Sequence, residues 1–312
     1  MTPAKSAFSE RAAHWLTSQL GHYDVLRAYR SDSKRTGVWK IRSDEGVFFF
    51  KINRRRNRWG SEVFAYRNWS EAFAPYLPEL RAVFDCPDNP GLLLTAVPGS
   101  PLREAGLTGS DSARAFARAG RLLRRLHDFA VGEFFGCMDE EGRPIDWSGQ
   151  PLSASRRTDL VLQMREFLTA QLERGKAIGC LASDEQEAIT WAIDAADCYA
   201  SEVPVPTSED FTPGNWLVDD KGDLVAVIDL ENMHWGDRMN PFARLVLEYF
   251  PKNPEGEQAF YKGYGSCPPK EHIDQARIAY IMYAASYTIA GVESNDPGSS
   301  ERGRRAFLRS RG

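Results

Sequence analysis

The sequence lacks any long uninterrupted run of apolar residues. No stretch reaches the length of about 18 residues that a membrane-spanning helix needs, so no membrane partner is expected. The N-terminal segment also lacks the apolar core of a secretory signal, because the charged residues Glu10 and Arg11 interrupt it. We therefore predict a cytoplasmic protein.

Cysteine is scarce, and its positions are widely scattered. No pair has the CxxC spacing, and the number of cysteines is odd, so neither a zinc site nor a disulfide framework is expected. In the cytoplasm we expect these thiols to be reduced and mostly buried. The five residues are Cys86, Cys137, Cys180, Cys198 and Cys267.

A surplus of positive charge is also missing. The sequence has 39 Lys and Arg against 43 Asp and Glu, a formal net charge of −4, so no nucleic-acid partner is expected. The composition is otherwise that of a globular protein, with 42% hydrophobic and 26% charged residues, which excludes a disordered chain. A length of 312 residues allows one large domain or two lobes.

One dense basic cluster stands out against this acidic average. It begins at Lys51 and continues with Arg54, Arg55, Arg56 and Arg58. A solvated loop between a strand and a helix accounts for such a cluster. The alternative is attraction of ATP phosphates or of an anionic substrate, because a local basic patch concentrates anions whatever the net charge. Both interpretations stay open.

The pattern of apolar residues changes near residue 97. Before it, β-rich runs and turns surround one helical pattern; the runs are 36–41, 47–52, 81–85 and 92–97, and the helix is 59–73. After Pro98-Gly99, helical patterns dominate, at 110–129, 160–172, 183–196 and 273–292, with short β runs at 215–218 and 224–229. We therefore predict an N-terminal lobe over 1–97 and a helical lobe over 98–312.

Three oxygen-bearing side chains occur at the ends of the short β runs. Asp210 and Asn215 lie in a loop, and Asp229 directly follows the apolar run Leu-Val-Ala-Val-Ile. Oxygen ligands suit Mg²⁺, and a remaining carboxylate can orient or deprotonate a hydroxyl. Asp and Asn are also common in turns, and for any one of these residues alone a turn role is the favoured interpretation. Asp229 is the least easily explained as a turn residue, because a carboxylate leaving a buried strand needs a partner.

The segment from Thr207 to Asp229 resembles the catalytic and metal loops of aminoglycoside phosphotransferases and related small-molecule kinases. The shared pattern is an Asp, an Asn five residues later, an apolar strand that ends in Ile-Asp, a Gly-Asp and then a helix. The resemblance implies an α+β, two-lobed, protein-kinase-like fold, with a small antiparallel-sheet N-lobe for the nucleotide and a larger helical C-lobe. The C-lobe would carry the catalytic loop, the metal loop and the acceptor site. It also implies ATP or GTP and Mg²⁺ as cofactors.

The resemblance assigns roles residue by residue. Asp210 falls on the position of the catalytic base, and Asn215 and Asp229 fall on the two metal-ligand positions. Lys51, at the end of an aromatic strand, falls on the residue that holds the α- and β-phosphates, with Glu62 as its ion-pair partner. The remaining implied nucleotide-binding residues are Thr95, Ala96 and Val97 of the hinge and Ser33 of the nucleotide loop.

The sequence departs from the family pattern in three places. Ser208 stands where the family has a His that braces the catalytic loop, and we expect a less rigid loop that keeps activity. The nucleotide loop, residues 31–37, contains one Gly and no GxGxxG motif. Asn240-Pro241 stands where an acidic residue usually heads the following helix.

The acceptor is not fixed by the sequence. Glu231, His234, Trp235 and Glu293 are the candidate acceptor-binding residues. Carboxylates among them suit a polycationic aminoglycoside, whereas the aromatic surroundings also suit a nucleoside, a peptide-like antibiotic or a sugar. We therefore predict an ATP-dependent phosphotransferase that acts on a small-molecule hydroxyl, in antibiotic resistance or specialised metabolism, as a monomer or homodimer.

Two alternatives remain at this point. One is a pseudokinase-like module that binds nucleotide or acts as a scaffold, which Ser208 and the sparse nucleotide loop suggest. The other is a metabolic kinase of the choline or homoserine type. Phosphorylation of a protein side chain is disfavoured, because the segment between Asp229 and Pro241 is too short for the usual activation segment.

Overall fold

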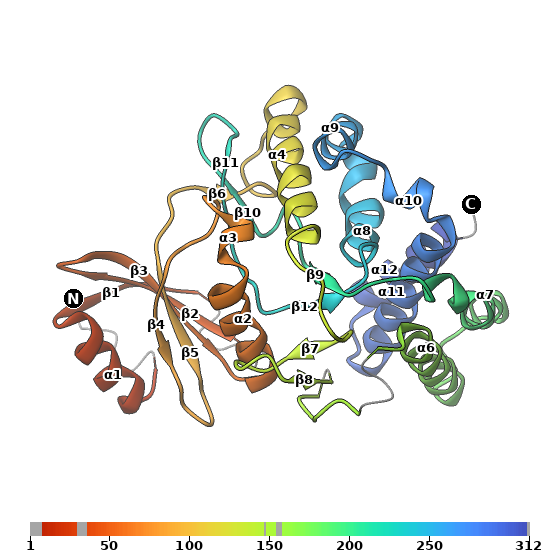
Figure 1. The fold of residues 1–312 in the computed structure, drawn as a ribbon, viewed down its shortest axis with the longest axis horizontal. Coiled ribbons are helices and arrows are strands. Elements are labelled where there is room, and N and C mark those ends of the chain that lie inside the picture. The colour runs from red at the N-terminus through yellow and green to blue at the C-terminus, as the bar shows by residue number, and fades with distance from the viewer. Residues whose placement is uncertain (1–7, 30–35, 147, 154–157, 311–312) are drawn as a thin grey trace. The chain divides into compact units, whose positions relative to one another are not determined.

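The computed structural model describes residues 8–29, 36–146, 148–153 and 158–310 (Figure 1). The chain forms two compact units. Unit 1 consists of residues 1–106, 137–151 and 214–233, and unit 2 consists of residues 107–136, 152–213 and 234–312. Both units are discontinuous in sequence, whereas the two predicted lobes were continuous stretches that met at residues 97 and 98.

Unit 1 is built on a five-stranded antiparallel sheet with the order β1-β2-β3-β5-β4. The strands are β1 (Tyr23–Tyr29), β2 (Thr36–Ser43), β3 (Gly46–Asn53), β4 (Leu80–Phe84) and β5 (Gly91–Thr95). A tight turn joins β2 to β3, where Ser43 pairs with Gly46 and Gly46 has a φ of 134°. The four predicted runs therefore form strands, and β1 is an additional strand at the sheet edge.

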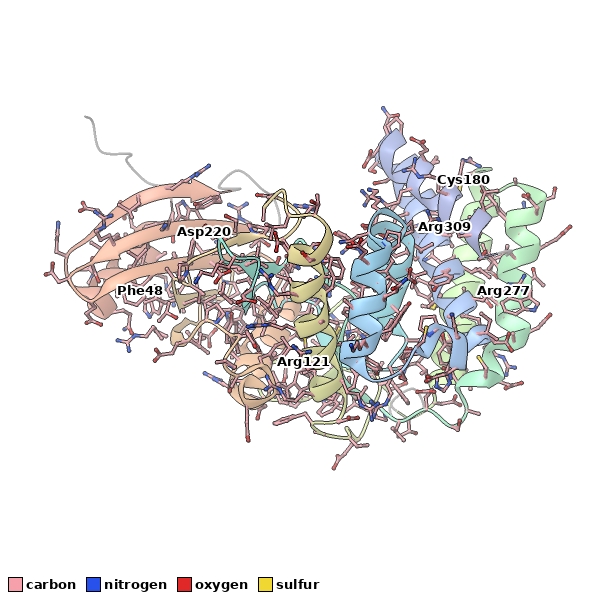
Figure 2. The ribbon with its side chains drawn as sticks, turned by 90° about the horizontal axis from the view of Figure 1, so that it is seen from above. Phe48, Arg121, Cys180, Asp220, Arg277 and Arg309 are labelled. Atoms are coloured by element: carbon pink, nitrogen blue, oxygen red, sulfur yellow. The ribbon has the colours of Figure 1, made fainter. Side chains whose placement is uncertain are left out.

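The core of this sheet is aromatic. Helix α1 (Glu10–Leu20) begins after Ser9, whose side chain accepts a hydrogen bond from the Ala12 amide, and its buried face packs with the sheet. Figure 2 marks Phe48 on β3, one of the core residues. The buried cluster consists of Ala12, Leu16, Leu20, Trp39, Ile41, Phe48, Phe50, Ile52, Phe84, Cys86 and Leu93. Burial of these large apolar side chains fixes which face of the sheet is internal.

The remaining elements of unit 1 are helices, a second sheet and a small hairpin. Helix α2 (Arg56–Asn68) follows β3 directly, and α3 (Ser70–Phe73) follows it. A second sheet has the order β11-β10-β6, from β6 (Ser100–Pro101), β10 (Trp216–Val218) and β11 (Leu224–Val227). Asp220 marks the turn between β10 and β11 in Figure 2. A small hairpin pairs β7 (Cys137–Met138) with β8 (Pro144–Ile145), and the Ser61 hydroxyl of α2 donates to the Met138 carbonyl at 3.0 Å.

Unit 2 is predominantly helical. Its core is formed by helices that meet through buried residues such as Leu168, Ile189, Ile281 and Phe307. Strands β9 (Val205–Ser208) and β12 (Met233–Gly236) pair beside the helices. The helices are α4 (Gly109–His127), α6 (Leu160–Ala177), α7 (Ser183–Asp194), η1 (Ala195–Tyr199), α8 (Asn240–Arg244), η2 (Leu245–Tyr249), η3 (Phe250–Lys252), α9 (Pro254–Tyr264), α10 (Pro268–Glu271), α11 (Ile273–Glu293) and α12 (Pro297–Arg309).

Helices α4 and α9 approach each other closely through glycine. A Cβ atom on Gly120 of α4 would lie 2.2 Å from the Phe260 carbonyl oxygen, and one on Gly263 of α9 would lie 2.1 Å from the Ala117 carbonyl oxygen. Because both contacts are with backbone, neither neighbour can move aside cheaply. The two glycines therefore set the spacing of this helix pair.

The helices and the cysteines were also the subject of expectations from composition. Among the described helices, none is both long enough and apolar enough to cross a membrane. All five cysteines carry free thiols, and three of them are buried.

Candidate active site

A buried ion pair connects strand β3 of the five-stranded sheet to helix α2. Lys51 is the sixth residue of β3, and its Nζ lies 2.8 Å from Oε2 of Glu62 on α2. The two side chains are 8% and 0% exposed. Removing Lys51 would leave the Glu62 carboxylate buried without its cation, a change that costs about 3–5 kcal/mol in proteins. The predicted pairing of Lys51 with Glu62 is thus present in the structure.

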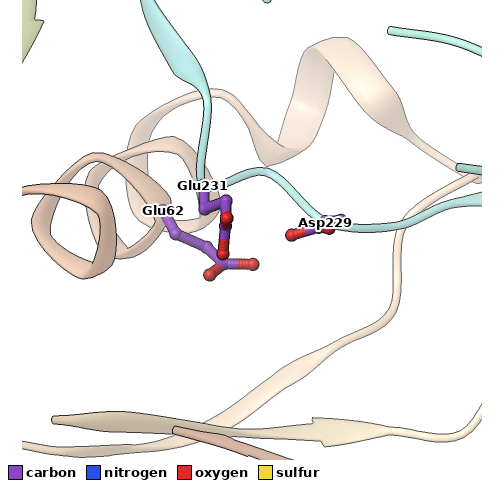
Figure 3. A group of neighbouring side chains, drawn as sticks. All are labelled: Glu62, Asp229 and Glu231. Atoms are coloured by element: carbon purple, nitrogen blue, oxygen red, sulfur yellow. The ribbon is translucent and has the colours of Figure 1, made fainter. Parts of the chain in front are cut away.

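Two further carboxylates reach the same ammonium group. Lys51 Nζ lies 2.5 Å from Oδ1 of Asp229 and 3.1 Å from Oε2 of Glu231, both just beyond β11. The same Glu231 oxygen accepts from Asn53 Nδ2 at 3.0 Å and from the Thr36 hydroxyl at 3.4 Å. Figure 3 shows the three carboxylates side by side. Glu231, a candidate acceptor residue from the sequence, therefore belongs to the Lys51 cluster.

The cluster carries more negative than positive charge. One ammonium faces Glu62, Asp229 and Glu231, whose nearest oxygens lie within 4.8 Å of one another. Burial by itself lowers the pKa of Lys51, but the charges of Asp229, Glu62 and Glu231 outweigh it and raise this pKa well above its usual value. Burial raises the pKa of Glu62 to about 7, against the opposing charge of Lys51. The geometry thus keeps Lys51 charged and leaves carboxylate oxygens in excess.

The backbone around Asp229 is unusual. Asp229 has a φ of 65°, in the left-handed region that Asp and Asn visit more readily than most residues. The preceding amide, that of Ile228, donates to the Asn215 carbonyl at 3.0 Å. The hydrogen bond brings the chain at Asn215 beside the chain at Asp229. The two predicted metal-ligand residues therefore occupy neighbouring positions in unit 1.

The predicted hinge follows β5. Thr95 is the last residue of that strand, and Ala96 and Val97 come directly after it. The Thr95 amide donates to the Glu79 carbonyl and the Ala96 amide to the Val47 carbonyl, both at 3.0 Å. These two donors are used within the protein. Ser33, the predicted nucleotide-loop residue, lies outside the described residues.

Asp210 lies in unit 2, in the loop after β9. Its amide donates to Oγ of the buried Ser208 at 3.1 Å, and the Phe211 amide donates to the Ser208 carbonyl at 3.4 Å. The Thr212 hydroxyl lies 3.5 Å from Asp210 Oδ1. Ser208, which replaces the histidine of the family pattern, therefore contributes local hydrogen bonds to this loop.

A buried histidine from another element supports the strand that leads into the loop. His127 ends α4, and its Nε2 lies 3.4 Å from the hydroxyl of Thr207 on β9. Its Nδ1 lies 2.8 Å from the Tyr264 hydroxyl. Burial, together with the charges of Arg238 and Arg124, lowers the pKa of His127 well below its usual value. His127 is therefore a neutral hydrogen-bonding residue at neutral pH.

The Asp210 carboxylate has a charged partner that the sequence did not indicate. Arg244, the last residue of α8, forms an ion pair with Oδ1 of Asp210 through Nη1, and its Nη2 lies 3.2 Å from Oε2 of Glu248. Glu248 in turn accepts a hydrogen bond from the Tyr283 hydroxyl on α11. Arg244 is 34 residues from Asp210 in the chain and matches no motif, so no local pattern predicts the pair.

The other candidate acceptor residues have different surroundings. His234 and Trp235 are buried in β12, with relative exposures of 4% and 9%. Glu293, at the end of α11, accepts two hydrogen bonds from the Arg174 guanidinium, one from Nε at 2.6 Å. Its charge is therefore balanced within unit 2 by a surface ion pair.

The fold is that of a kinase-like phosphotransferase. A model of the phosphotransferase enzyme family matches residues 25–278, and the chain belongs to that family. The family resemblance predicted from the sequence is confirmed, and so is the prediction of an enzyme of the small-molecule kinase class. No curated protein matches the sequence.

Solved structures of aminoglycoside phosphotransferases share the fold. The crystal structure of aminoglycoside phosphotransferase APH(4)-Ia has a TM-score of 0.69 at 14% identity, covering 96% of this chain and 98% of that one. The GDP complex of aminoglycoside 2'-phosphotransferase-IIIa has a TM-score of 0.67 at 13% identity, covering 97% and 98%. The gentamicin-APH(2")-IIa complex has a TM-score of 0.63 at 16% identity, covering 96% of both chains. The predicted α+β kinase-like fold is confirmed.

Proposed function

We propose that the protein transfers the γ-phosphoryl group of ATP or GTP to a hydroxyl of a small molecule. The observation that carries this proposal is the buried Lys51–Glu62 pair together with Asp229 in one cluster of unit 1. Phosphoryl transfer depends mainly on positioning and on neutralisation of phosphate charge, and a fixed, always-charged lysine supplies both. Glu62 holds the ammonium group in place, so that its direction is set before the nucleotide binds.

Asp210 is the proposed catalytic base. It would orient the acceptor hydroxyl and receive its proton as the oxygen attacks the γ-phosphorus and the bond to the β-phosphate oxygen breaks. Its side chain is 25% exposed, so a substrate can reach it. The hydrogen bond from its own amide to Ser208 fixes the loop conformation without occupying the carboxylate.

The donor set near Lys51 suits Mg²⁺. Asp229 and Asn215 are the proposed ligands, because carboxylate and amide oxygens are the donors that this hard cation prefers. The excess negative charge of Glu62, Asp229 and Glu231 over Lys51 favours a cation at this place. When bound, Mg²⁺ would supply charge neutralisation on the phosphate oxygens. Asp229, which contacts Lys51 in this structure, would hold the cation, and Lys51 would be the residue that faces the phosphates.

The adenine or guanine edge is proposed to bind at residues 95–97. Since the amides of Thr95 and Ala96 donate within the protein, the Val97 amide is the donor assigned to the base. Structures with this fold have been solved with AMP-PNP and hygromycin B in APH(4)-Ia and with GDP and kanamycin in APH(2")-IIia. Those complexes support a nucleotide and a small hydroxylated molecule as ligands. We infer a role in resistance or specialised metabolism.

The test is an acceptor screen with the purified full-length protein. ATP and GTP are each supplied with and without Mg²⁺, and nucleoside diphosphate release is measured for hydroxylated antibiotics, nucleosides, sugars and amino alcohols. We expect Mg²⁺-dependent release that requires an acceptor, with a phosphorylated product detected by mass spectrometry. Tight nucleotide binding without transfer to any acceptor would instead favour the pseudokinase-like alternative.

A further inference from the structure

The contacts of Asp210 continue as a chain of side chains through unit 2. Arg244 links Asp210 to Glu248, and Glu248 accepts a hydrogen bond from Tyr283. The ring of Tyr283 stacks on Tyr287 one helical turn later, with centroids 4.3 Å apart. The candidate catalytic carboxylate is therefore connected, through charged and aromatic groups, to the half-buried Tyr287 of α11.

A second guanidinium, that of Arg302, contacts both Tyr287 and Glu248. Arg302 of α12 lies over the Tyr287 ring, with 5.1 Å from Cζ to the ring centroid, and its Nε is 3.8 Å from Oε1 of Glu248. Its side chain is 44% exposed, and both tyrosines are half-buried. The surface next to Asp210 thus combines stacked rings with groups that a solute can reach.

The backbone that places Arg244 and Glu248 is itself uncommon. Arg244 ends α8, and a π-helical turn over Leu245–Tyr249 follows without interruption. Single π-helical turns are rare and occur frequently at functional sites. In this turn, Glu248 contacts Arg244 on one side and Tyr283 on the other. The distortion therefore coincides with the contact chain.

The charges of the contact chain balance. Two guanidinium groups, Arg244 and Arg302, face two carboxylates, Asp210 and Glu248. Burial by itself raises the pKa of Glu248, but Arg244 and the Tyr283 hydrogen bond lower it below its usual value. The carboxylates that a polycation would need beside the catalytic loop are thus already paired with arginines.

We propose that Arg244, Glu248, Tyr283, Tyr287 and Arg302 form the acceptor-recognition surface, and that it selects a hydroxylated ring compound with at most one positive charge. The inference rests on the proposed function of Asp210. The ring of the acceptor packs against the tyrosine pair, while its hydroxyl takes the place of Arg244 on the Asp210 carboxylate. Arg244 then repels acceptors that bring several ammonium groups, because the guanidinium cannot lose its charge.

The first test compares acceptors that differ in charge. Uncharged or singly charged compounds, such as nucleosides and aryl glycosides, are assayed beside polycationic aminoglycosides in Mg²⁺-dependent phosphoryl transfer. We expect kcat/KM for the best compound of the first set to exceed that for every polycation by about tenfold or more, one step on the logarithmic affinity scale. A clear preference for the polycations would overturn the inference and leave the proposed function intact. Transfer to no compound would overturn both.

The second test uses substitutions in the recognition surface. Arg244→Gln removes the repelling charge, so the ratio of kcat/KM for a polycation to that for the best ring compound should rise by about tenfold. Tyr287→Leu should raise KM for the ring compound by about twofold to tenfold, the range expected for the loss of one aromatic contact.

Two further variants keep this test decisive. Arg302→Gln should also raise the ratio of kcat/KM for a polycation to that for the best ring compound. It replaces Arg244→Gln in the test if that variant fails to fold. Arg305→Gln is the matched control, because Arg305 lies on α12 like Arg302 but pairs with Glu301. An unchanged ratio in both Arg244→Gln and Arg302→Gln would contradict the inference.

Discussion

Lys51 and Glu62 form a buried ion pair, with Nζ 2.8 Å from Oε2, between a central strand and a helix of unit 1. Both side chains are buried, so the Glu62 carboxylate depends on the Lys51 ammonium for its compensating charge. The same ammonium contacts Asp229, which is the proposed metal ligand. We therefore expect the pair to connect the stability of unit 1 with the proposed binding of nucleotide.

Lys51→Met should lower kcat by about 10²-fold or more, the scale on which loss of one electrostatic group acts in a transition state. It should also weaken nucleotide binding, because the phosphates lose their fixed cation. Steady-state kinetics and calorimetry measure the two effects. Lys40→Met is the control, since Lys40 is on the neighbouring strand and lies over the Phe49 ring. Equal losses in both variants would contradict the role of Lys51.

Asp229→Asn should raise the Mg²⁺ concentration needed for half-maximal activity by about tenfold or more, the scale on which even outer-shell changes alter metal affinity. Asn tolerates the φ of 65° at this position, so the backbone is preserved while the charge is lost. A Mg²⁺ titration of activity measures the shift. Asp220→Asn, in the exposed turn after β10, should leave the titration curve where it is in the wild type.

His127→Gln should reduce the loss of unfolding free energy that the protein shows as the pH falls below 6.5. His127 has a lowered pKa in the folded state, so below pH 6.5 the unfolded chain binds a proton that the native state excludes. Its contribution to stability is full above pH 6.5 and falls by about 1.4 kcal/mol per pH unit below it, until the folded-state pKa is reached. The His127→Gln variant lacks this loss.

Chemical denaturation of the wild type and of His127→Gln at pH 7.5 and 5.5 measures this effect. The difference in unfolding free energy between the two proteins should be smaller at pH 5.5. Asp237, whose pKa burial raises to about 7, titrates in the same range but is common to both proteins and cancels. A difference that does not change with pH would show that His127 titrates normally.

Gly120→Ala should destabilise the protein by about 1–3 kcal/mol, the usual cost of overpacking. The added Cβ would lie 2.2 Å from the Phe260 carbonyl, so α4 and α9 must move apart. Thermal unfolding measures the loss. Gly298→Ala is the matched control, because its Cβ would meet only the Asp296 carboxylate at 3.3 Å in the first turn of α12. Equal stability of the two variants would contradict the packing argument.

Much of unit 1 could be predicted because its signals are local. The β-rich runs predict four of the five strands, and Lys51, Glu62 and Asp229 each belong to a short motif on one element. Helix α1 is not among the predicted elements, although Ser9 followed by apolar residues at Ala12, Leu16 and Leu20 is a helical pattern.

The surroundings of Asp210 could not be predicted in the same way. Arg244, Glu248 and Tyr283 come from three elements, and an arginine on a helix is usually a solvated charge. Glu231 was assigned to the acceptor because it follows Asp229, yet its contact with Lys51 depends on the pairing of distant segments. Such contacts follow from tertiary packing and leave no periodic trace in the sequence.

The most direct test of the proposed function compares the wild type with Asp210→Asn on the best acceptor. The substitution preserves size and removes the proton acceptor, so kcat should fall by about 10²–10⁴-fold, the usual contribution of a general base. Nucleotide affinity, measured by calorimetry, should change little, because Asp210 is assigned to the acceptor hydroxyl. A large loss of kcat at unchanged nucleotide affinity is the predicted result, and wild-type turnover in Asp210→Asn would contradict it.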